Sequence, residues 1–411
     1  MSRVVITGLG VVSPIGNTVA DFWDNIVANR HGFTLDEWFP GQTEEKNVVA
    51  KVKDFDVSKY VDKKSARRMD ILTQYAVYAS MQALEDAGTK FSDLDPYRCG
   101  VIIGSGIGGI QTAEEQILTY HNKNNSRVSV FTIPMMIGNM AAGTVSIKTG
   151  FKGANYCTVS ACASGTHAIG EAFRAIKYGY LDCAIAGGVE ACQMGFALAG
   201  FNNMHAVTRS TDPDRASIPF DKERSGFVLG DGSGIVILEE YEHAKKRGAK
   251  IYAEVAGYGA TCDAYHETSP DPEGRGGAKA MEFAVNEAGV SPETINYCNA
   301  HGTSTAINDR TETAALKITF GEHARDMVIN STKSMTGHLL GAAGGVEAIA
   351  TVLQMKNDLV HATVGLKVDD EECDLDYCKG GNREMKITGA ISNSLGFGGH
   401  NATLCFLPVN D

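Results

Sequence analysis

Short apolar runs that end at glycine or small polar residues alternate along this chain with longer segments in which apolar residues keep a helical spacing. The runs with the length of buried strands are residues 3–8 (RVVITG), 99–104 (CGVIIG), 156–160, 183–187 and 234–239. The segments with a helical pattern are residues 21–28, 69–87, about 163–178 and 240–247. The polar residues 121–130 (HNKNNSRVSV) predict an exposed loop. Strands that alternate with helices in this way predict an α/β layered fold.

Two segments repeat the same order of features. Residues 156–172 run from a strand through small residues and Cys162 into a Gly/Ala-rich helix, and residues 328–348 do the same through Lys333 and His338. The opening VVITGLG also echoes ITGA near residue 387. Any α/β chain can show such echoes, so the repeat by itself leaves both interpretations open. The interpretation as a true repeat divides the chain into similar halves, residues 1–250 and 251–411.

Composition and charge narrow the class of protein. The chain has 411 residues with 46 glycines and only 10 prolines, which suits tight strand–helix turns rather than a disordered chain. Its net charge of −12 argues against wholesale nucleic-acid binding. No apolar run approaches the ~18 residues of a membrane span, and the start lacks the pattern of a signal peptide. The ten cysteines form no CxxC pair, so we expect neither a disulfide scaffold nor a zinc site, and a cytoplasmic location.

Cys162 is distinguished from the other cysteines by its position. It lies in SACASG, directly after a predicted strand and at the start of a predicted helix. Unpaired N–H groups and the helix dipole at such a position favour a thiolate, so we expect a lowered pKa and an activated nucleophile. The alternative, a buried core cysteine, is the usual fate of free cysteines. It suits Cys162 less well, because a turn of small residues fills a core poorly.

Two histidines occupy similar turns. His301 lies in NAHGTST after an apolar stretch, and His338 lies in STKSMTGHLLGAAG after another strand. Each could donate a hydrogen bond to a developing oxyanion or relay a proton. A lone histidine is more often a packing residue. Two histidines and one cysteine at strand ends favour a shared site, because ligands bind at the carboxyl ends of strands in α/β sheets.

Two glycine-rich segments remain. The C-terminal SNSLGFGGHN surrounds Phe397 with flexible residues that would let it move, although it could be a plain turn before a last strand. Residues 104–109 (GSGIGG) match the GxGxxG of dinucleotide-binding proteins. That fingerprint also requires an acidic residue about 20 positions later at the end of a second strand, and this chain has none there. No P-loop is present, so nucleotide hydrolysis also lacks support.

Taken together these segments resemble the β-ketoacyl-[acyl-carrier-protein] synthases, the condensing enzymes of fatty-acid synthesis, and among them the type II elongating enzymes. The resemblance covers nearly the whole chain and rests on motifs in the same order: VVITGLGVVSPIGN, GSGIGG, SACASGTHAIGEA, PFDKERSGFVLGDGSG, NAHGTSTAINDRTE, STKSMTGHLLGAAGG and SNSLGFGGHNA. It implies a thiolase-like fold, in which two similar αβα halves form a five-layered αβαβα core, and a homodimer.

The resemblance also implies the chemistry. Cys162 would hold an acyl chain taken from a carrier protein, and His301 and His338 would stabilise the enolate as malonyl-carrier loses carbon dioxide. Lys333 would orient the His338 region, with Asp309, Glu312 and Glu347 as charged supports. Phe397 would gate the site, and its N–H would join that of Cys162 in an oxyanion hole. No metal or cofactor is implied.

Further roles concern substrate binding. The resemblance implies Ile107 and Phe201 as acyl-pocket residues, and Thr268, Thr303 and Thr305 as contacts of the phosphopantetheine arm. Basic residues stand out on so acidic a chain and would dock an acidic acyl carrier protein, although a solvated helix face is the simpler interpretation: Lys64, Arg67 and Arg68. Positions that depart from the family pattern put chain length and gating in doubt, not the reaction: Thr132, His205, Ala306, Asn308, Leu395 and His400.

Several other functions compete with elongation. A ketosynthase of a type II polyketide or aryl-polyene pathway would share the mechanism and differ in its acceptor chain. Thiolases use a second cysteine, initiating synthases pair histidine with asparagine, and chain-length partners lack the nucleophile, so all three fit less well. A carrier-binding scaffold without catalysis would need the basic residues but no activated thiol.

Overall fold

The computed structural model of the protein describes residues 1–37, 46–123 and 127–409. Strands and helices alternate along its first part: β1 (Val4–Val12), α1 (Val19–Val27), β2 (Thr34–Glu37), β3 (Lys46–Ala50), α2 (Lys63–Ala66), α3 (Ile71–Ala87), β4 (Cys99–Gly104), α4 (Ile110–Lys123), α5 (Thr132–Met136), α6 (Met140–Thr149), β5 (Asn155–Tyr156), α7 (Ser164–Lys177), β6 (Cys183–Glu190), α8 (Gly195–Asn203), β7 (Leu229–Gly230), β8 (Gly232–Glu240) and α9 (Tyr241–Lys246). The second part continues in the same way: β9 (Ala253–Cys262), α10 (Arg275–Ala288), β10 (Tyr297–Asn299), α11 (Ala306–Phe320), β11 (Val328–Asn330), α12 (Lys333–Thr336), α13 (Ala343–Asn357), β12 (Leu359–Val360), β13 (Arg383–Glu384), β14 (Ala390–Gly396) and β15 (His400–Leu407).

The main strands form two sets with the same pairing pattern. The strand order is β11-β10-β14-β15-β9-β1-β8-β6-β4-β5. From β1 outward, two antiparallel pairs are followed by two parallel pairs, and the same sequence of pairs runs outward from β9. At the centre β1 and β9 pair over three residues, Val4–Ile6. The chain therefore consists of two topologically similar halves.

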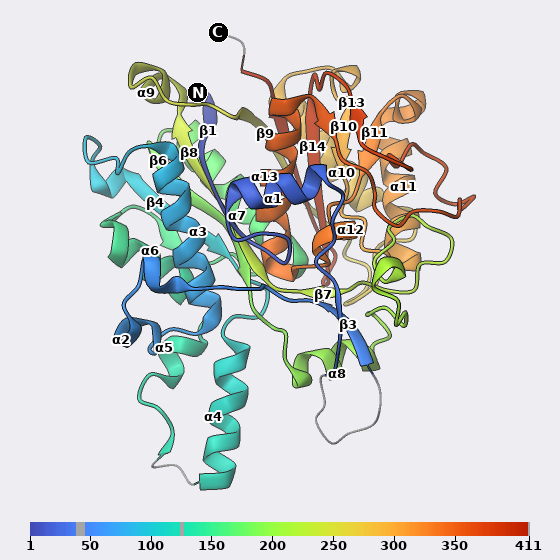
Figure 1. Ribbon diagram of the computed structural model, residues 1–411. Helices are drawn as coiled ribbons and strands as arrows, with labels where there is room; N and C mark the ends of the chain where they lie inside the picture. The colour runs from blue at the N-terminus through green and yellow to red at the C-terminus, as the bar shows by residue number, and fades with distance from the viewer. Residues whose placement is uncertain (38–45, 124–126, 410–411) are drawn as a thin grey trace.

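Five layers result from this arrangement. Helices α7 and α13 pack against strands of both sets, so they form the central layer. Helices α3 and α6 cover the outer face of the first set, and α10 and α11 cover the outer face of the second. Figure 1 shows the layers from left to right, with α3 on the left and α11 on the right. The predicted α/β thiolase-like αβαβα fold is confirmed.

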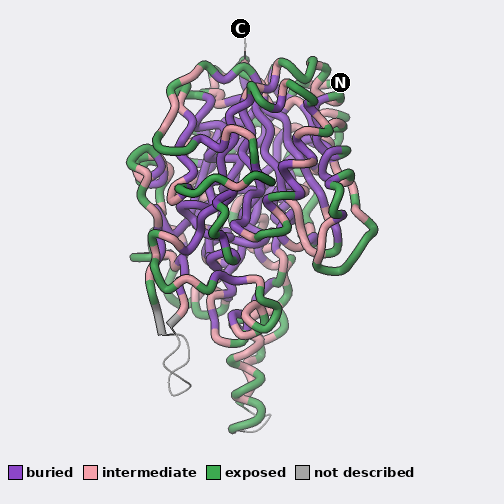
Figure 2. The backbone as a smooth tube through the Cα atoms, turned by 90° about the vertical axis from the view of Figure 1, so that its right-hand side faces the viewer, coloured by how far each residue is buried: buried purple, intermediate pink, exposed green. Residues whose placement is uncertain are grey.

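Apolar burial explains why these layers hold together. The central core joins the inner faces of both strand sets to α7 and α13, and the buried positions fill the interior in Figure 2. The many glycines near the start of α13 allow a close approach: a Cβ on Gly345 would lie 2.1 Å from the carbonyl oxygen of Gly234 in β8. The Gly/Ala-rich pattern therefore reflects backbone contact between the central helix layer and a sheet.

The structure sharpens the predicted repeat. β5 and β11 occupy equivalent places at the two ends of the strand order, and they precede the turns of Cys162 and His338. The second echo was wrong, because the counterpart of β1 is β9, whereas the segment after residue 387 leads into β14. The division at residue 250, between α9 and β9, stays a prediction.

Two local predictions also need correction. The strand predicted at residues 156–160 is shorter and lies earlier, because only Asn155–Tyr156 pairs with β4. The loop predicted at residues 121–130 begins late, since α4 continues to Lys123, and residues 124–126 lie outside the described part. Both errors arise where polar or small residues stand at the end of an element, so that the local pattern does not mark where it stops.

Candidate active site

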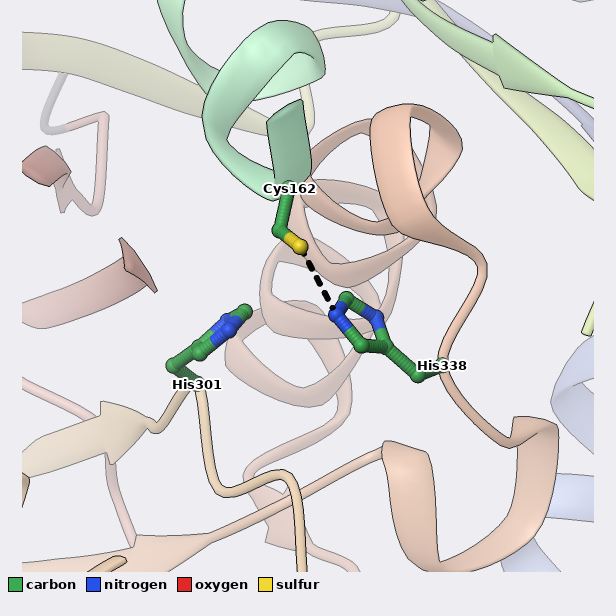
Figure 3. A group of neighbouring side chains, drawn as sticks. All are labelled: Cys162, His301 and His338. Carbon is green, nitrogen blue, oxygen red and sulfur yellow. Dashed lines mark hydrogen bonds between the residues drawn. The ribbon is translucent and has the colours of Figure 1, made fainter. Parts of the chain in front are cut away.

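Three turns bring one cysteine and two histidines together. Cys162 lies in a short 3-10 turn between β5 and α7, His301 follows β10, and His338 follows α12. Nε2 of His338 lies 3.0 Å from Sγ of Cys162. The imidazole centroids lie 5.2 Å apart, and their planes are almost perpendicular at 84°. Figure 3 shows the two rings, which come from different chain segments, beside the thiol. The shared site that the sequence predicted for these three residues is therefore present.

The hydrogen bonds of His338 define its tautomer. Its backbone is bound to β7, because its N–H donates to the carbonyl of Val228 and its own carbonyl accepts from the N–H of Gly230. The N–H of Leu340 donates to Nδ1 of the ring at 3.3 Å. Since Nδ1 accepts a hydrogen bond, it carries no proton. The proton of the neutral ring therefore lies on Nε2, which faces Cys162.

His301 is oriented by a buried lysine. The Nζ ammonium of Lys333 lies 3.2 Å from Nδ1 of His301 and forms an ion pair with Glu347. Because the ammonium can only donate, Nδ1 accepts and the ring proton lies on Nε2. The prediction that Lys333 orients the His338 region was wrong in its target, since Lys333 contacts His301. Both imidazoles therefore present an Nε2–H group.

Burial and charge keep these rings neutral. Burial lowers the pKa of His301 well below its usual value, and the charge of Lys333 adds to the effect. The same two causes, in the same order, lower the pKa of His338. A neutral imidazole with a fixed tautomer donates one hydrogen bond through its single N–H and accepts one at the other ring nitrogen.

The electrostatic prediction for Cys162 was wrong. The turn does precede a helix, α7, but burial raises the pKa of the thiol to about 12, and the nearby charge of Lys333 offsets only part of that effect. The helix N-terminus is outweighed because removing the thiolate from water costs more than a partial charge returns. Ala161, just before the nucleophile, has a φ of 50°, a strained conformation held by the surrounding fold.

Two buried carboxylates hold the turn of His301. Glu312 accepts hydrogen bonds from the N–H groups of His301 and Gly302, both at 2.8 Å. Asp309 accepts from the N–H of Thr303 at 3.0 Å and lies 3.6 Å from the Arg224 guanidinium. These carboxylates lie behind the histidine, so they support the turn rather than face the thiol.

A single cavity of about 540 Å³ joins the nucleophile to most of the predicted binding residues. The predicted residues that line it are Cys162, His301, His338, Ile107, Phe201, Thr268, Thr303, Thr305 and Phe397. Of the departures from the family pattern, His205, Ala306, Asn308 and Leu395 line the cavity, whereas Thr132 and His400 do not. The structure therefore brings the predicted chemical, acyl and pantetheine residues to one place.

The predicted docking residues form a separate surface. Lys64 lies in the short helix α2, and Arg67 and Arg68 follow it with exposed side chains. The guanidinium of Arg68 stacks over the ring of Phe131 at 4.8 Å. None of the three lines the cavity, so they cannot contact the reacting atoms.

The sequence analysis missed Glu190. Its carboxylate is fully buried at the end of β6 and accepts hydrogen bonds from the backbone of Gly106, Ile107 and Gly341. Burial raises its pKa to about 7 although these N–H groups pull the other way. An acidic residue that ends a wholly apolar strand was the available signal.

The ligand atoms of Cys162, His301 and His338 lie within 4.8 Å of one another, the spacing of a metal site. The ammonium of Lys333 beside His301 disfavours the second positive charge that a metal ion would bring there.

Among the described residues, no helix is long and apolar enough to cross a membrane.

Comparisons with known proteins agree with this geometry. Residues 1–244 match the model of the beta-ketoacyl synthase N-terminal domain, and residues 252–367 match that of the C-terminal domain. The 3-oxoacyl-[acyl-carrier-protein] synthase 2 of Synechocystis sp. is 50% identical over 405 residues, which cover 98% of this chain and 97% of the relative. The enzyme of the same name from Staphylococcus aureus is 48% identical over 404 residues, 98% of each chain.

Solved structures show the same fold over the full length of both chains. A type II polyketide ketosynthase in complex with its acyl-carrier protein, AntDE:AntF, superposes with a TM-score of 0.92 at 36% identity and covers 100% of each chain. A beta-ketoacyl synthase from Burkholderia phymatum gives 0.90 at 35% identity, again over 100% of each chain. With both family models matched and relatives at about half identity, the chain belongs to the beta-ketoacyl synthase family.

Proposed function

We propose that this chain catalyses the decarboxylative condensation of an acyl chain on Cys162 with malonyl-[acyl-carrier protein], which lengthens a fatty-acyl chain by two carbons. The observation that carries the proposal is the convergence of two neutral Nε2–H groups and one thiol at a single cavity. This arrangement suits a reaction in which negative charge develops on a thioester oxygen. The enzyme is an acyltransferase.

The first step transfers the acyl group. Sγ of Cys162 attacks the acyl-carrier thioester, the carbon–sulfur bond to phosphopantetheine breaks, and the thiol proton ends on the departing pantetheine sulfur. Within the described chain, the N–H groups of Cys162 and Phe397 have no protein acceptor, apart from the thiol that the Cys162 N–H adjoins. A Cβ on Gly396 would lie 3.1 Å from the Cys162 nitrogen, so the Phe397 loop reaches the nucleophile. We assign the oxyanion hole to these two N–H groups.

The second step releases carbon dioxide. The malonyl carboxylate leaves as its carbon–carbon bond breaks, and the electron pair forms an enolate whose oxygen accepts hydrogen bonds from His301 and His338. The enolate carbon attacks the Cys162 thioester and expels the thiolate, which takes a proton from solvent. Lys333 and Glu347 keep His301 in the donating tautomer, and Asp309 and Glu312 hold its turn.

The cavity separates acyl and pantetheine ends. Ile107 and Phe201 lie on the apolar wall, where Phe201 packs edge-on against Phe227 at 5.4 Å. The hydroxyls of Thr303 and Thr305 lie 2.8 Å apart, and Thr268 is exposed. The apolar side chains of Ile107 and Phe201 suit an acyl chain, and the three threonine hydroxyls suit the polar phosphopantetheine arm. Phe397, which lines the same cavity, is assigned as the gate.

Fatty-acid elongation is favoured over the polyketide or aryl-polyene alternative. Curated relatives named 3-oxoacyl-[acyl-carrier-protein] synthase 2 are 47–50% identical, against 36% for the type II polyketide ketosynthase. The test is to incubate the protein with malonyl-carrier and saturated acyl-carriers of increasing length, and to identify products by mass. One two-carbon extension per turnover is expected. Repeated extension of an unreduced chain would contradict the fatty-acid assignment.

We propose that Lys64, Arg67 and Arg68 dock the acidic carrier. An Arg67→Glu/Arg68→Glu variant is expected to raise the KM for acyl-carrier about tenfold at low salt with little change in kcat, because two attractive charges become repulsive. Steady-state kinetics at rising ionic strength would show the difference shrinking. Lys90→Glu, a single charge reversal beyond the far end of α3, is the control, and it is compared with Arg67→Glu alone as well as with the double variant. An unchanged KM would remove these arginines from the docking surface.

We also propose a homodimer built on the open sheet edge. Among the described strands β5 pairs only with β4, and apolar side chains near it are exposed: Ile147, in helix α6 that contacts β5, at 81%, and Val159, three residues after β5, at 68%. Helix α4 projects from the body and exposes Ile117 and Leu118 (Figure 1). An open strand edge flanked by such a patch is suited to pairing with a second copy.

Ile147→Asp is expected to shift sedimentation from dimer to monomer, because a charge would be buried unpaired in the contact. Ile318→Asp, which changes an isoleucine that is 57% exposed on the outer helix α11, should leave the dimer intact. Dimers of unchanged stability in Ile147→Asp would place the interface elsewhere.

The cytoplasmic location stays a prediction.

A further inference from the structure

The buried carboxylate of Glu190 joins two loops that come from different halves of the chain. One loop follows β4 and carries Ile107 of the acyl wall, and the other follows His338. The donors to Oε1 are Ser105 Oγ at 2.9 Å and Ile107 N at 3.3 Å, and the donors to Oε2 are Gly106 N at 2.8 Å and Gly341 N at 3.0 Å. A carboxylate with four donors is an anchor, because the two buried donors, Ser105 and Gly341, would otherwise lack a partner.

The anchored Gly341 follows a strained residue. Leu340 has a φ of 46°, a left-handed conformation that is strained for a residue with a side chain. In this conformation its N–H points at Nδ1 of His338 at 3.3 Å. The strain therefore persists because the chain is held on both sides: His338 is bound to β7, and Gly341 is bound to Glu190.

We propose that Glu190 is a positioning residue that, through Gly341 and Leu340, keeps the ring proton of His338 on Nε2. Without the anchor, Leu340 relaxes toward an ordinary conformation and its N–H leaves Nδ1. The ring is then free to carry its proton on Nδ1, and Nε2 becomes an acceptor for the thiol of Cys162 rather than a donor to the enolate. This inference rests on the proposed role of His338 as an Nε2–H donor.

The geometry separates this role from a contribution to folding alone. The two backbone hydrogen bonds of His338, to the carbonyl of Val228 and from the N–H of Gly230, do not involve Glu190. The loops nevertheless meet at the carboxylate with no space to spare, since a Cβ on Gly341 would lie 2.4 Å from the nitrogen of Gly106. Losing the carboxylate therefore changes the turn after His338 without displacing the histidine backbone.

The test combines a spectroscopic and a kinetic measurement on the full chain. Protein labelled with ¹⁵N-histidine reports which ring nitrogen of His338 is protonated, with His338→Ala used to assign the signal. Wild type is expected to show Nε2–H. Glu190→Ala is expected to show a mixture with Nδ1–H, together with an about tenfold slower release of carbon dioxide from malonyl-carrier. Acylation of Cys162 should change less than twofold.

Three further variants sharpen the result. Glu190→Gln keeps an oxygen for Gly106 and Gly341 and can turn its amide to Ser105, so it should retain the wild-type tautomer and rate. Glu190→Met fills the volume without accepting hydrogen bonds, and it should behave like Glu190→Ala if the alanine variant folds poorly. Glu239→Ala is the matched control, because Glu239 is an equally buried carboxylate. It lies in β8, opposite Cys183 at the other end of β6 in the strand register.

The outcomes separate the inference from the function on which it rests. Retention of the wild-type tautomer and rate in folded Glu190→Ala or Glu190→Met overturns the role of Glu190. An equal loss in Glu239→Ala also overturns it, because the effect would then be one of stability. Normal decarboxylation by His338→Ala would instead refute the proposed role of His338 itself.

Discussion

Cys162→Ala is expected to form no covalent acyl-enzyme and to lose condensation by about 10³-fold or more, because no other thiol among the described residues lines the cavity. The sulfur of Cys162, the proposed nucleophile, lies 3.0 Å from Nε2 of His338. The neighbouring Cys192 packs in the same apolar cluster but does not line the cavity. Mass spectrometry of the intact protein after incubation with acyl-carrier measures the adduct directly.

The same variant separates the two half-reactions. Release of carbon dioxide needs the imidazole donors and not the thiol, so Cys162→Ala should still decarboxylate malonyl-carrier while it makes no 3-oxoacyl product. Cys157→Ala, which removes a half-buried thiol five positions earlier, should keep both activities. A persistent acyl adduct in Cys162→Ala would place the nucleophile at another residue.

His301→Ala and His338→Ala should each slow decarboxylation by about 10²–10³-fold, the usual effect of removing one preorganised donor to an oxyanion. Each donor is aimed by a partner on Nδ1: Lys333 for His301 and the Leu340 N–H for His338. Acylation of Cys162 should fall much less, because that step uses backbone N–H groups. The two rates therefore change independently, which a general loss of fold would not produce.

The rate of decarboxylation is measured as labelled carbon dioxide released from malonyl-carrier that carries an isotope in its free carboxylate. The extent of Cys162 acylation is measured as the mass of the acyl adduct. His323→Ala is a suitable control, since its Nε2 bonds the carbonyl of Ile295 away from the cavity. Wild-type decarboxylation in both single variants would show that the enolate is stabilised by other groups.

The elements and the reacting residues were accessible from the sequence because their signals are local. Apolar runs closed by glycine mark the strands, and turns of small residues mark Cys162, His301 and His338. The motifs that resemble the family are contiguous segments of the same kind. Even the equivalence of β5 and β11 was visible as a repeated order of features, whereas the short echo at residue 387 was too brief to identify the right strand.

What the tertiary structure alone decided is the state of those residues. The contact between His338 and Cys162 spans 176 positions, and the bond from Gly341 to Glu190 spans 151. No local pattern specifies such partners. The raised pKa of Cys162, the contact of Lys333 with His301 and the anchoring role of Glu190 follow from burial and from hydrogen bonds between residues far apart in the sequence. The sequence by itself thus determined the fold class and the reacting groups, and only folding determined their protonation and orientation, because both depend on neighbours that the chain brings together from a distance.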